Sequence, residues 1–326
     1  MSDSTASPNA APAPVLPPKK SRTGLIVGVV VAVAVLIAAI LVIVNIVRPG
    51  ASDEPGAETG LGSASDPVRL GAVGTSDPYW QVYVDAALEE GIHVELVDFG
   101  EYPQPNPALS AGEIDINQFQ HIIYLAQYNV AASDDLTPIG STAIYPLGLY
   151  STQYDSVEDI PEGSTVAIPD DPSNLARGLL VLQSAGLVEL TDGGSIFATL
   201  DDVESSSKVE VTTLEAGLTA TSLPDVAAAI LNNDFIENAG LTADDAIAQD
   251  DPSDPNALPY VNIFATRADD ADNEVLNRLV EIYQETQAVL DGVQETSGGT
   301  AEFLKIPASE LQDSLATVED DTAAQG

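Results

Sequence analysis

The stretch TVAIPDDPSNLARGLLVL, residues 165–182, contains a complete strand–turn–helix pattern. Its first residues, Thr165–Pro169, form a short apolar run that is typical of a buried strand. The Asp-Asp-Pro sequence that follows indicates a tight turn, and we expect Ser173 to cap a helix that carries Arg177. Strands that lead directly into helices are the units from which α/β folds with parallel sheets are built.

Strand and helix patterns alternate on both sides of this stretch. Apolar runs predict strands at Val68–Val73, His93–Phe99, Ile139–Ser151, Thr165–Pro169, Val209–Thr213, Ala227–Leu231 and Tyr260–Thr266. Helical patterns occur at Tyr79–Glu90, Asn106–Ala111, Phe119–Ala131 and Asn273–Leu290. We therefore predict an α/β fold with a mostly parallel sheet.

Composition excludes several classes of function. The 326 residues are enough for two domains, and the formal charge of −41 argues against nucleic acid, because phosphate binding depends on lysine and arginine. The chain has no cysteine, which excludes disulfides, thiolate catalysis, cysteine metal sites and a lipid-modified cysteine.

An uncharged apolar run marks the N-terminal part of the chain. Residues 24–44 would form a helix of about 31 Å, which matches the hydrocarbon core of a bilayer. Basic residues are denser before this run than after it, so we predict a single-pass signal anchor over residues 23–47 in the cell membrane, with a cytoplasmic N-terminus and the large domain on the extracytoplasmic face. The alternative is a cleaved signal peptide, whose apolar region is normally shorter.

Three segments have the composition of disordered chain. Residues 1–22 are rich in Pro, Ala and Ser and predict a disordered cytoplasmic tail. Residues 48–65 predict a flexible linker, and we also expect Asp320–Gly326 to be disordered.

Arg177 is an unusual cation in so acidic a chain. Residues 51–326 hold six basic and fifty acidic residues, a formal charge of −44, and Arg177 lies on a weakly polar helix. A helix N-terminus attracts anions, and an arginine one turn inside it would add a bidentate hold on a carboxylate. The alternative is a surface arginine paired with Asp170 or Asp171.

Aromatic and amide residues form the other candidate sites. On the predicted helix that starts at Phe119, His121 and Tyr124 share a face, and the N-terminal residues could project into a cleft. Tyr102 lies in a loop, and Asn232 follows an apolar strand, where amides suit the crevice of an open α/β sheet. Core packing and ordinary turn chemistry are the alternatives for these residues.

No enzyme signature is present in the sequence. The chain has no HExxH, GxSxG, P-loop or dinucleotide motif, and we predict no cofactor and no metal site. The acidic run at residues 250–254 lacks the glycine and the terminal glutamate of a calcium loop.

Taken in order, these segments resemble the NlpA-type methionine-binding lipoproteins, the substrate-binding proteins of methionine ABC importers. The resemblance covers about residues 68–290 and rests on the strings YPQPNPALSAGEIDINQFQHIIYL, YPLGLYS, VAIPDDPSNLARGLLVLQSAGLVEL, EVTTLEAGL and PYVNIFATR. The family is usually held by a lipidated cysteine, whereas this chain has the apolar run instead.

The resemblance implies a type II periplasmic-binding-protein fold, in which two α/β lobes enclose a ligand cleft. Lobe I would comprise residues 66–143 and 260–326, and lobe II residues 144–259. The implied function is extracytoplasmic binding of an amino acid, with methionine as the expected ligand, and delivery to an ABC permease and its ATPase.

The resemblance also implies a role for each candidate site residue. The apolar side chain of the ligand would lie against Tyr102, Phe119, His121 and Tyr124. Arg177 would bind the α-carboxylate, and Asn174 and Asn232 would help to fix the α-amino and carboxylate groups.

Other functions stay open at this point. One is a binding protein for another amino acid or a short peptide, and another is an adhesin or sensor that feeds no transporter. An enzyme that acts on an amino-acid-like substrate is a third, with His121 as its base.

Overall fold

The computed structural model describes residues 60–253 and 257–325. The predicted cytoplasmic tail, the predicted membrane span at 24–44 and most of the predicted linker lie outside these residues. Within them, no helix combines the length and the apolar character that crossing a bilayer requires.

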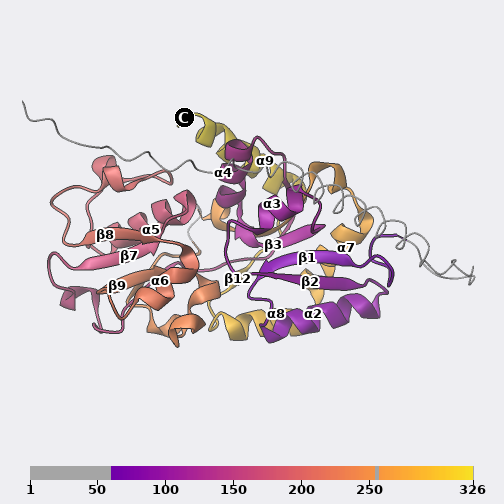
Figure 1. Ribbon diagram of the computed structural model, residues 1–326, viewed down its shortest axis with the longest axis horizontal. Coiled ribbons are helices and arrows are strands. Elements are labelled where there is room, and N and C mark those ends of the chain that lie inside the picture. The colour runs from indigo at the N-terminus through magenta and orange to yellow at the C-terminus, as the bar shows by residue number, and fades with distance from the viewer. Residues whose placement is uncertain (1–59, 254–256, 326) are drawn as a thin grey trace, which may run out of the picture. The chain divides into compact units, whose positions relative to one another are not determined.

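Two five-stranded sheets organise the described residues (Figure 1). The first has the order β2-β1-β3-β11-β4 and the second the order β10-β6-β9-β7-β8. We call the parts built on them lobe I and lobe II. The strands of the first sheet are β1 (Val68–Val73), β2 (Val94–Phe99), β3 (Ile116–His121), β4 (Thr137–Ser141) and β11 (Asn262–Thr266). Those of the second are β6 (Gly148–Tyr150), β7 (Thr165–Pro169), β8 (Glu210–Leu214), β9 (Ala228–Leu231) and β10 (Ala248–Gln249).

The prediction of a mostly parallel sheet is wrong, because both sheets are mixed. In lobe I, β1 is parallel to β2 and β3, whereas β11 is antiparallel to β3 and β4. In lobe II, β7 is parallel to β8 and β9, whereas β6 is antiparallel to β9 and β10. The antiparallel pairs involve the strands at which the chain passes from one sheet to the other.

The chain crosses between the lobes twice. It leaves lobe I after β4, passes β5 (Ala143–Ile144) and enters β6, and it returns between β10 and β11. Strand β5 pairs with β12 (Glu302–Phe303) near the C-terminus. The residue bounds that the resemblance implies for each lobe stay predictions.

Helices cover both faces of the lobe I sheet (Figure 1). They are α2 (Pro78–Glu89), α7 (Glu274–Glu285) and α8 (Gln287–Thr296) on one face and α3 (Pro105–Ser110), α4 (Ile122–Ala132) and α9 (Ala308–Ala323) on the other. Trp80, Tyr83 and Tyr283 fill the first core, and Leu125, Ile263 and Leu311 belong to the second. Because β1 lies between two covered faces, five of its six residues are buried.

Lobe II has α5 (Pro172–Ser184) on one side of its sheet and α6 (Ala216–Ser222) on the other. The core on the α5 side is aliphatic and includes Val166, Ile168 and Leu179. The core on the α6 side extends across the lobe boundary, since Tyr102 and Phe119 of lobe I pack with Phe235 of lobe II. The two lobes therefore share an apolar cluster where they meet.

Several predicted elements differ in the structure. Residues 116–121 form β3, and α4 begins only at Ile122, so the helix predicted from Phe119 is wrong at its start. The single helix predicted over Asn273–Leu290 is two helices, because Thr286 has a non-helical backbone (φ −81°, ψ 101°). Gly292 then allows α8 to lie against α2, since a Cβ there would stand 2.7 Å from that of Tyr79.

Both ends of the described chain are more ordered than the composition suggests. Helix α9 continues to Ala323, which corrects the prediction of disorder from Asp320. Residues 60–65, the described end of the predicted linker, turn back through a bridge between Ser63 and Asp66, and Leu61 packs on the lobe I core. Apolar contacts of Leu61 and of Val318 on α9 oppose disorder at both ends.

Candidate functional site

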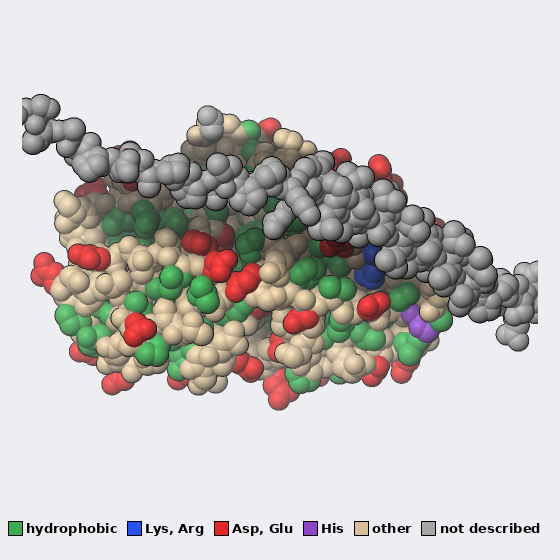
Figure 2. All heavy atoms as spheres, in the orientation of Figure 1, with side chains coloured by type: hydrophobic (Ala, Val, Ile, Leu, Met, Phe, Trp, Pro, Cys, Tyr) green, Lys and Arg blue, Asp and Glu red, His purple; other side chains and the backbone are tan. Residues whose placement is uncertain are grey.

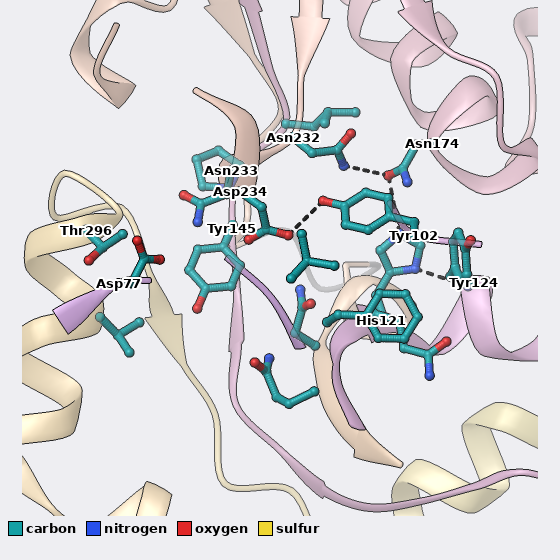
Figure 3. A pocket seen from close by; sticks show the side chains of 18 of the residues that line it. Asp77, Tyr102, His121, Tyr124, Tyr145, Asn174, Asn232, Asn233, Asp234 and Thr296 are labelled. Carbon is teal, nitrogen blue, oxygen red and sulfur yellow. Dashed lines mark hydrogen bonds between the residues drawn. The ribbon is translucent and has the colours of Figure 1, made fainter. Parts of the chain in front are cut away.

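All seven residues singled out from the sequence line one cleft between the lobes. Lobe I contributes Tyr102, Phe119, His121 and Tyr124, and lobe II contributes Asn174, Arg177 and Asn232. Figure 3 shows the labelled members converging from both sides. The elements that carry them are separated by up to 130 residues in the sequence, so the fold alone brings them together.

The lobe I wall is built at the junction between β3 and α4. Strand β3 pairs with β11 through a bulge in which Phe119 is the extra residue, and bulges change the direction of a side chain. His121 follows as the N-cap of α4, and its Nδ1 accepts a hydrogen bond from the amide of Tyr124 at 3.2 Å. Phe119, His121 and Tyr124 thus face the cleft because the strand ends and the helix begins there.

Aromatic rings of this junction form one cluster with Tyr102, which precedes α3. The centroid of Tyr102 lies 5.9 Å from that of Phe119, 6.1 Å from that of Tyr124 and 5.2 Å from that of Phe235, which belongs to lobe II. Phe119 and Tyr124 meet edge to face at 5.7 Å. Such contacts add about 0.5–1.5 kcal/mol per pair beyond area burial, so the apolar wall is held firmly.

The lobe II wall is built at the junction between β7 and α5. The predicted cap, Ser173, is wrong: Asp171 is the N-cap and accepts from the backbone amide of Asn174 at 2.9 Å. Asp171 also accepts from the side-chain amide of Asn174 at 3.0 Å. The side-chain oxygen of Asn174, Oδ1, in turn accepts a hydrogen bond from Asn232 Nδ2 at 3.0 Å (Figure 3).

Asn174 also reaches across the cleft to lobe I. Its Oδ1 lies 3.4 Å from Nε2 of His121. Because His121 Nδ1 is an acceptor, its Nε2 carries the proton and donates to Asn174. Burial, together with the nearby charge of Arg177, lowers the pKa of His121 to about 3, so the ring is neutral at physiological pH. A base this weak argues against the hypothesis that His121 is a general base.

Arg177 is buried, with 8% of its side chain exposed, and its partner is Asp250. Arg177 Nε donates to Asp250 Oδ2 at 2.6 Å and Nη2 donates to Oδ1 at 3.1 Å, while Nη2 also donates to the carbonyl of Tyr145 at 2.8 Å. The guanidinium stands over the ring of Tyr260, 4.5 Å from its centroid. The alternative that Arg177 pairs at the surface with Asp170 or Asp171 is wrong.

The other arginines of the described chain have structural partners away from the cleft. Arg69 pairs with Asp115, Arg267 with Asp270 and Arg278 with Glu90. Acidic side chains are scattered over the face shown in Figure 2, and basic ones are scarce there. Arg177 is the one basic residue of the described chain that lines this cleft.

Two polar groups in the cleft have hydrogen-bonding capacity left. Among the described residues, Nη1 of Arg177 makes no hydrogen bond, although the other two nitrogens do. Asn232 Oδ1 is buried and has no partner among them. One free cationic donor and one free neutral acceptor suit the carboxylate and the ammonium of a zwitterion.

Two carboxylates, Asp77 of lobe I and Asp234 of lobe II, also line the cleft. Asp234 accepts from the hydroxyl of Tyr102 at 2.8 Å, a contact between lobes. Part of Asp234 is open to the cleft, but desolvation by the walls raises its pKa to about 6. The pKa of Asp77 also rises to about 6, from desolvation first and then from Glu237 and Asp98.

Sequence reasoning missed Asp250, Asp234, Asp77, Tyr145 and Tyr260. Asp234 lies two residues after Asn232, and its position beside a candidate amide was a usable signal. Asp250 belongs to the acidic run that was considered only as a calcium loop, and its partner is 73 residues away. No local pattern reports so distant a pairing.

Within the described residues no group of three or more His, Asp or Glu side chains is arranged to hold a metal ion.

Comparison with known proteins gives a consistent result. A family model described as NlpA lipoprotein matches residues 68–303. The D-methionine-binding lipoprotein MetQ of Salmonella typhi is 38% identical over 238 residues, which cover 71% of this chain and 86% of the relative. MetQ of Escherichia coli K12 is 39% identical over 213 residues, which cover 64% of this chain and 77% of the relative.

Solved structures agree with the sequence relatives. A crystal structure of the methionine-binding protein MetQ superposes with a TM-score of 0.69 at 36% identity and covers 73% of this chain and 98% of its own. A nutrient-binding protein from Burkholderia cenocepacia, bound to methionine, gives a TM-score of 0.67 at 34% identity. The superposition covers 72% of this chain and 99% of that protein. The described residues therefore have the same α/β fold as these periplasmic-binding-protein-like structures.

Proposed function

Because the chain belongs to the NlpA lipoprotein family, we propose that it is the substrate-binding protein of an ABC importer and that its ligand is methionine. The single observation that carries this proposal is the division of the cleft. Lobe II offers a guanidinium nitrogen of Arg177 and an amide oxygen of Asn232 that have no partner among the described residues, and lobe I offers aromatic rings. A zwitterionic amino acid with an apolar side chain has the matching groups.

The polar half of the ligand is assigned to lobe II. Arg177 Nη1 donates to the α-carboxylate, and Asn232 Oδ1 accepts from the α-ammonium. Asn174 has its amide engaged with Asp171, Asn232 and His121, so its role is to hold Asn232 in place. Asp234 and Asp77 make the cleft unfavourable for a second negative charge on the ligand.

The apolar half of the ligand is assigned to lobe I. Tyr102, Phe119, His121 and Tyr124 contact the side chain, and burial of apolar area supplies most of the free energy. A thioether adds about 0.3–1.5 kcal/mol when its sulfur lies at the edge of an aromatic ring. This favours methionine over an aliphatic side chain of similar length.

Binding requires movement of the lobes. The cavity volume is about 60 Å³, whereas small-molecule sites commonly have about 300–1,000 Å³. The ligand therefore enters when the lobes separate about the two crossing segments, as in a type II binding protein, and the lobes then close on it. The closed, loaded protein is the form delivered to the permease and its ATPase.

The N-terminal segment places this domain at the membrane. Residues 24–44 act as a single-pass anchor with a cytoplasmic N-terminus, in the role that a lipidated cysteine has in lipoproteins. Anchoring keeps the binding domain near the permease and raises its effective concentration there. We propose no catalytic step, since the one histidine of the cleft is a weak base.

Calorimetric titration of the purified full chain with L-methionine and D-methionine tests the ligand. Saturable binding of methionine and much weaker binding of glutamate and lysine are expected, with a gain of about 2.7 kcal/mol in unfolding free energy at a hundredfold excess over Kd. If methionine does not bind and another amino acid does, the proposed ligand is wrong and the proposed role in transport is unaffected. If none of the twenty amino acids binds, the proposed function is wrong.

A further inference from the structure

Asp250 is the residue that fixes the orientation of Arg177. It follows β10, at the start of the segment that returns to lobe I. Both of its oxygens engage the guanidinium, Oδ2 with Nε at 2.6 Å and Oδ1 with Nη2 at 3.1 Å. A bidentate pair of this kind fixes the plane of the guanidinium as well as its position.

Asp250 is itself held by the backbone. Its Oδ1 accepts from the amide of Leu147 at 2.7 Å, and Leu147 belongs to the segment on which the chain leaves lobe I. Arg177 Nη2 also donates to the carbonyl of Tyr145 in that segment. Asp250 therefore links both crossing segments to helix α5.

This arrangement leaves one edge of the guanidinium for the cleft. Nε and Nη2 share the edge that faces Asp250, and the ring of Tyr260 covers one face. Nη1 is the guanidinium nitrogen that has no hydrogen-bond partner within residues 60–253 and 257–325. Without Asp250, the guanidinium would be attracted to the other carboxylates of the cleft, Asp77 and Asp234, and would turn away from the ligand.

We propose that Asp250 is a positioning residue that holds Arg177 so that Nη1 meets the carboxylate of the ligand. Asp250 touches no ligand atom itself, and its effect is transmitted through the guanidinium. The inference rests on the proposed function, because it requires a ligand with a carboxylate. Removal of Asp250 therefore weakens recognition of that carboxylate and leaves recognition of the side chain unchanged.

The test is Asp250→Asn in the full chain, titrated with L-methionine and with L-methioninamide, which lacks the carboxylate. Asparagine keeps an oxygen for the Leu147 amide and places an amide nitrogen against Nε, where donor faces donor. We expect at least a tenfold loss of affinity for methionine and less than a threefold change for methioninamide. In an Arg177→Ala background the same substitution should change neither affinity.

Two further variants separate positioning from other effects. Asp251→Asn is the matched control, because Asp251 is exposed and, among the described residues, its side chain bonds only to Ser253. If Asp250→Asn does not fold, Asp250→Glu keeps the charge and displaces the carboxylate by one methylene. It should reduce the ratio of methionine to methioninamide affinity by a smaller factor.

The outcomes are distinct from those of the proposed function. Equal losses for both ligands would make Asp250 a structural residue, and tighter binding of methionine would make it a competitor of the ligand; either result overturns the inference. If the wild-type chain binds methionine and Asp250→Asn matches it, only the inference is wrong. If the wild-type chain binds no amino acid, both the proposed function and the inference are wrong.

Discussion

Each lobe lines the cleft with a strand-to-helix junction, but the two junctions carry different kinds of side chain. In lobe I, β3 leads into α4 and His121 caps the helix; in lobe II, β7 leads into α5 and Asp171 caps the helix. The first junction presents aromatic rings and the second presents an amide and a guanidinium. One backbone arrangement, used twice, thus places complementary groups for the two halves of an amino acid.

The strands behind these junctions are supported differently. Strand β7 is apolar, and Val166 and Ile168 pack in the aliphatic core on its α5 side. Strand β3 is polar yet fully buried, and its amides bond to one another and to Asn106 of α3. Gln120 Nε2 donates to Asn117 Oδ1 at 3.0 Å, and Asn106 Oδ1 accepts from Asn117 Nδ2 at 2.9 Å and from Gln120 Nε2 at 2.7 Å. The aromatic wall of the site therefore depends on a satisfied polar network.

The largest effect on the polar wall is expected from Arg177→Ala. The loss of a charge-assisted contact with the carboxylate should cost about 3 kcal/mol of binding, more than a hundredfold in Kd. The fold should persist, because Asp250 is 29% exposed and stays hydrated. Calorimetry and circular dichroism measure the two effects, with the surface variant Arg278→Ala as control. Wild-type affinity in Arg177→Ala would assign the carboxylate to another residue.

The polar network behind the aromatic wall is tested by Asn106→Ala. Asn106 accepts from Asn117 and Gln120 and donates to Gln120 Oε1 at 2.7 Å, so its loss leaves buried amides unpaired. The free energy of unfolding should fall by about 2–3 kcal/mol in urea titrations. The control is Gln81→Ala, at an exposed residue that bonds to Asp85. It should change the free energy of unfolding by less than about 0.5 kcal/mol. Equal losses of unfolding free energy in Asn106→Ala and Gln81→Ala would mean that the buried network does not stabilise the fold.

A smaller and selective effect is expected from Phe119→Leu on the aromatic wall. The residue stays apolar, but edge contacts with the ligand and with Tyr124 are lost. Methionine affinity should fall by about 1–1.5 kcal/mol, while alanine, which does not reach the wall, should bind as before. Phe303→Leu, in β12, is the control for a general packing change. A loss shared by methionine and alanine would contradict a specific role.

The contact between the walls at Asp234 predicts a dependence on pH. A carboxyl whose folded pKa is raised to about 6 contributes stability that is full below about 4 and lost as the pH rises through 6. Asp234→Asn should therefore stabilise the protein at pH 7.5 and change nothing at pH 3.5. The rise of the Asp234 pKa to about 6 corresponds to about 3 kcal/mol of unfolding free energy, and solvent in the cleft reduces this to about 1 kcal/mol.

Thermal unfolding at several pH values measures this dependence. The exposed Asp225→Asn is the matched control and should leave the pH profile unchanged. A profile of Asp234→Asn that runs parallel to the wild-type profile would show that Asp234 does not titrate in this range.

The difference between the walls also explains what the sequence could predict. The apolar strand β7 and helix α5 follow local rules and were predicted within a few residues, as was β1. Strand β3 reads INQFQH, and the helical spacing of its last residues with Tyr124 predicted a helix that starts at Phe119. Only pairing with β1 and β11 and a partner for each amide make that strand possible, and neither is visible in one segment.

The candidate site shows the same limit. Its seven residues were found because the charge of Arg177, the helix start and the resemblance all point to the cleft. Asp250 was missed because it contacts Arg177 through tertiary structure alone. Ser173 was predicted as the N-cap, and Asp171 in the same turn is an equally good capping residue. Where two residues satisfy a local rule equally, packing decides between them.

The most direct test of the division between the walls is one titration series. Wild type, Arg177→Ala and Phe119→Leu are each titrated with L-methionine, L-methioninamide and L-alanine. Arg177→Ala should lose the preference for methionine over methioninamide and keep the preference for methionine over alanine; Phe119→Leu should do the reverse. If both variants reduce both preferences alike, the two walls do not divide the ligand between them.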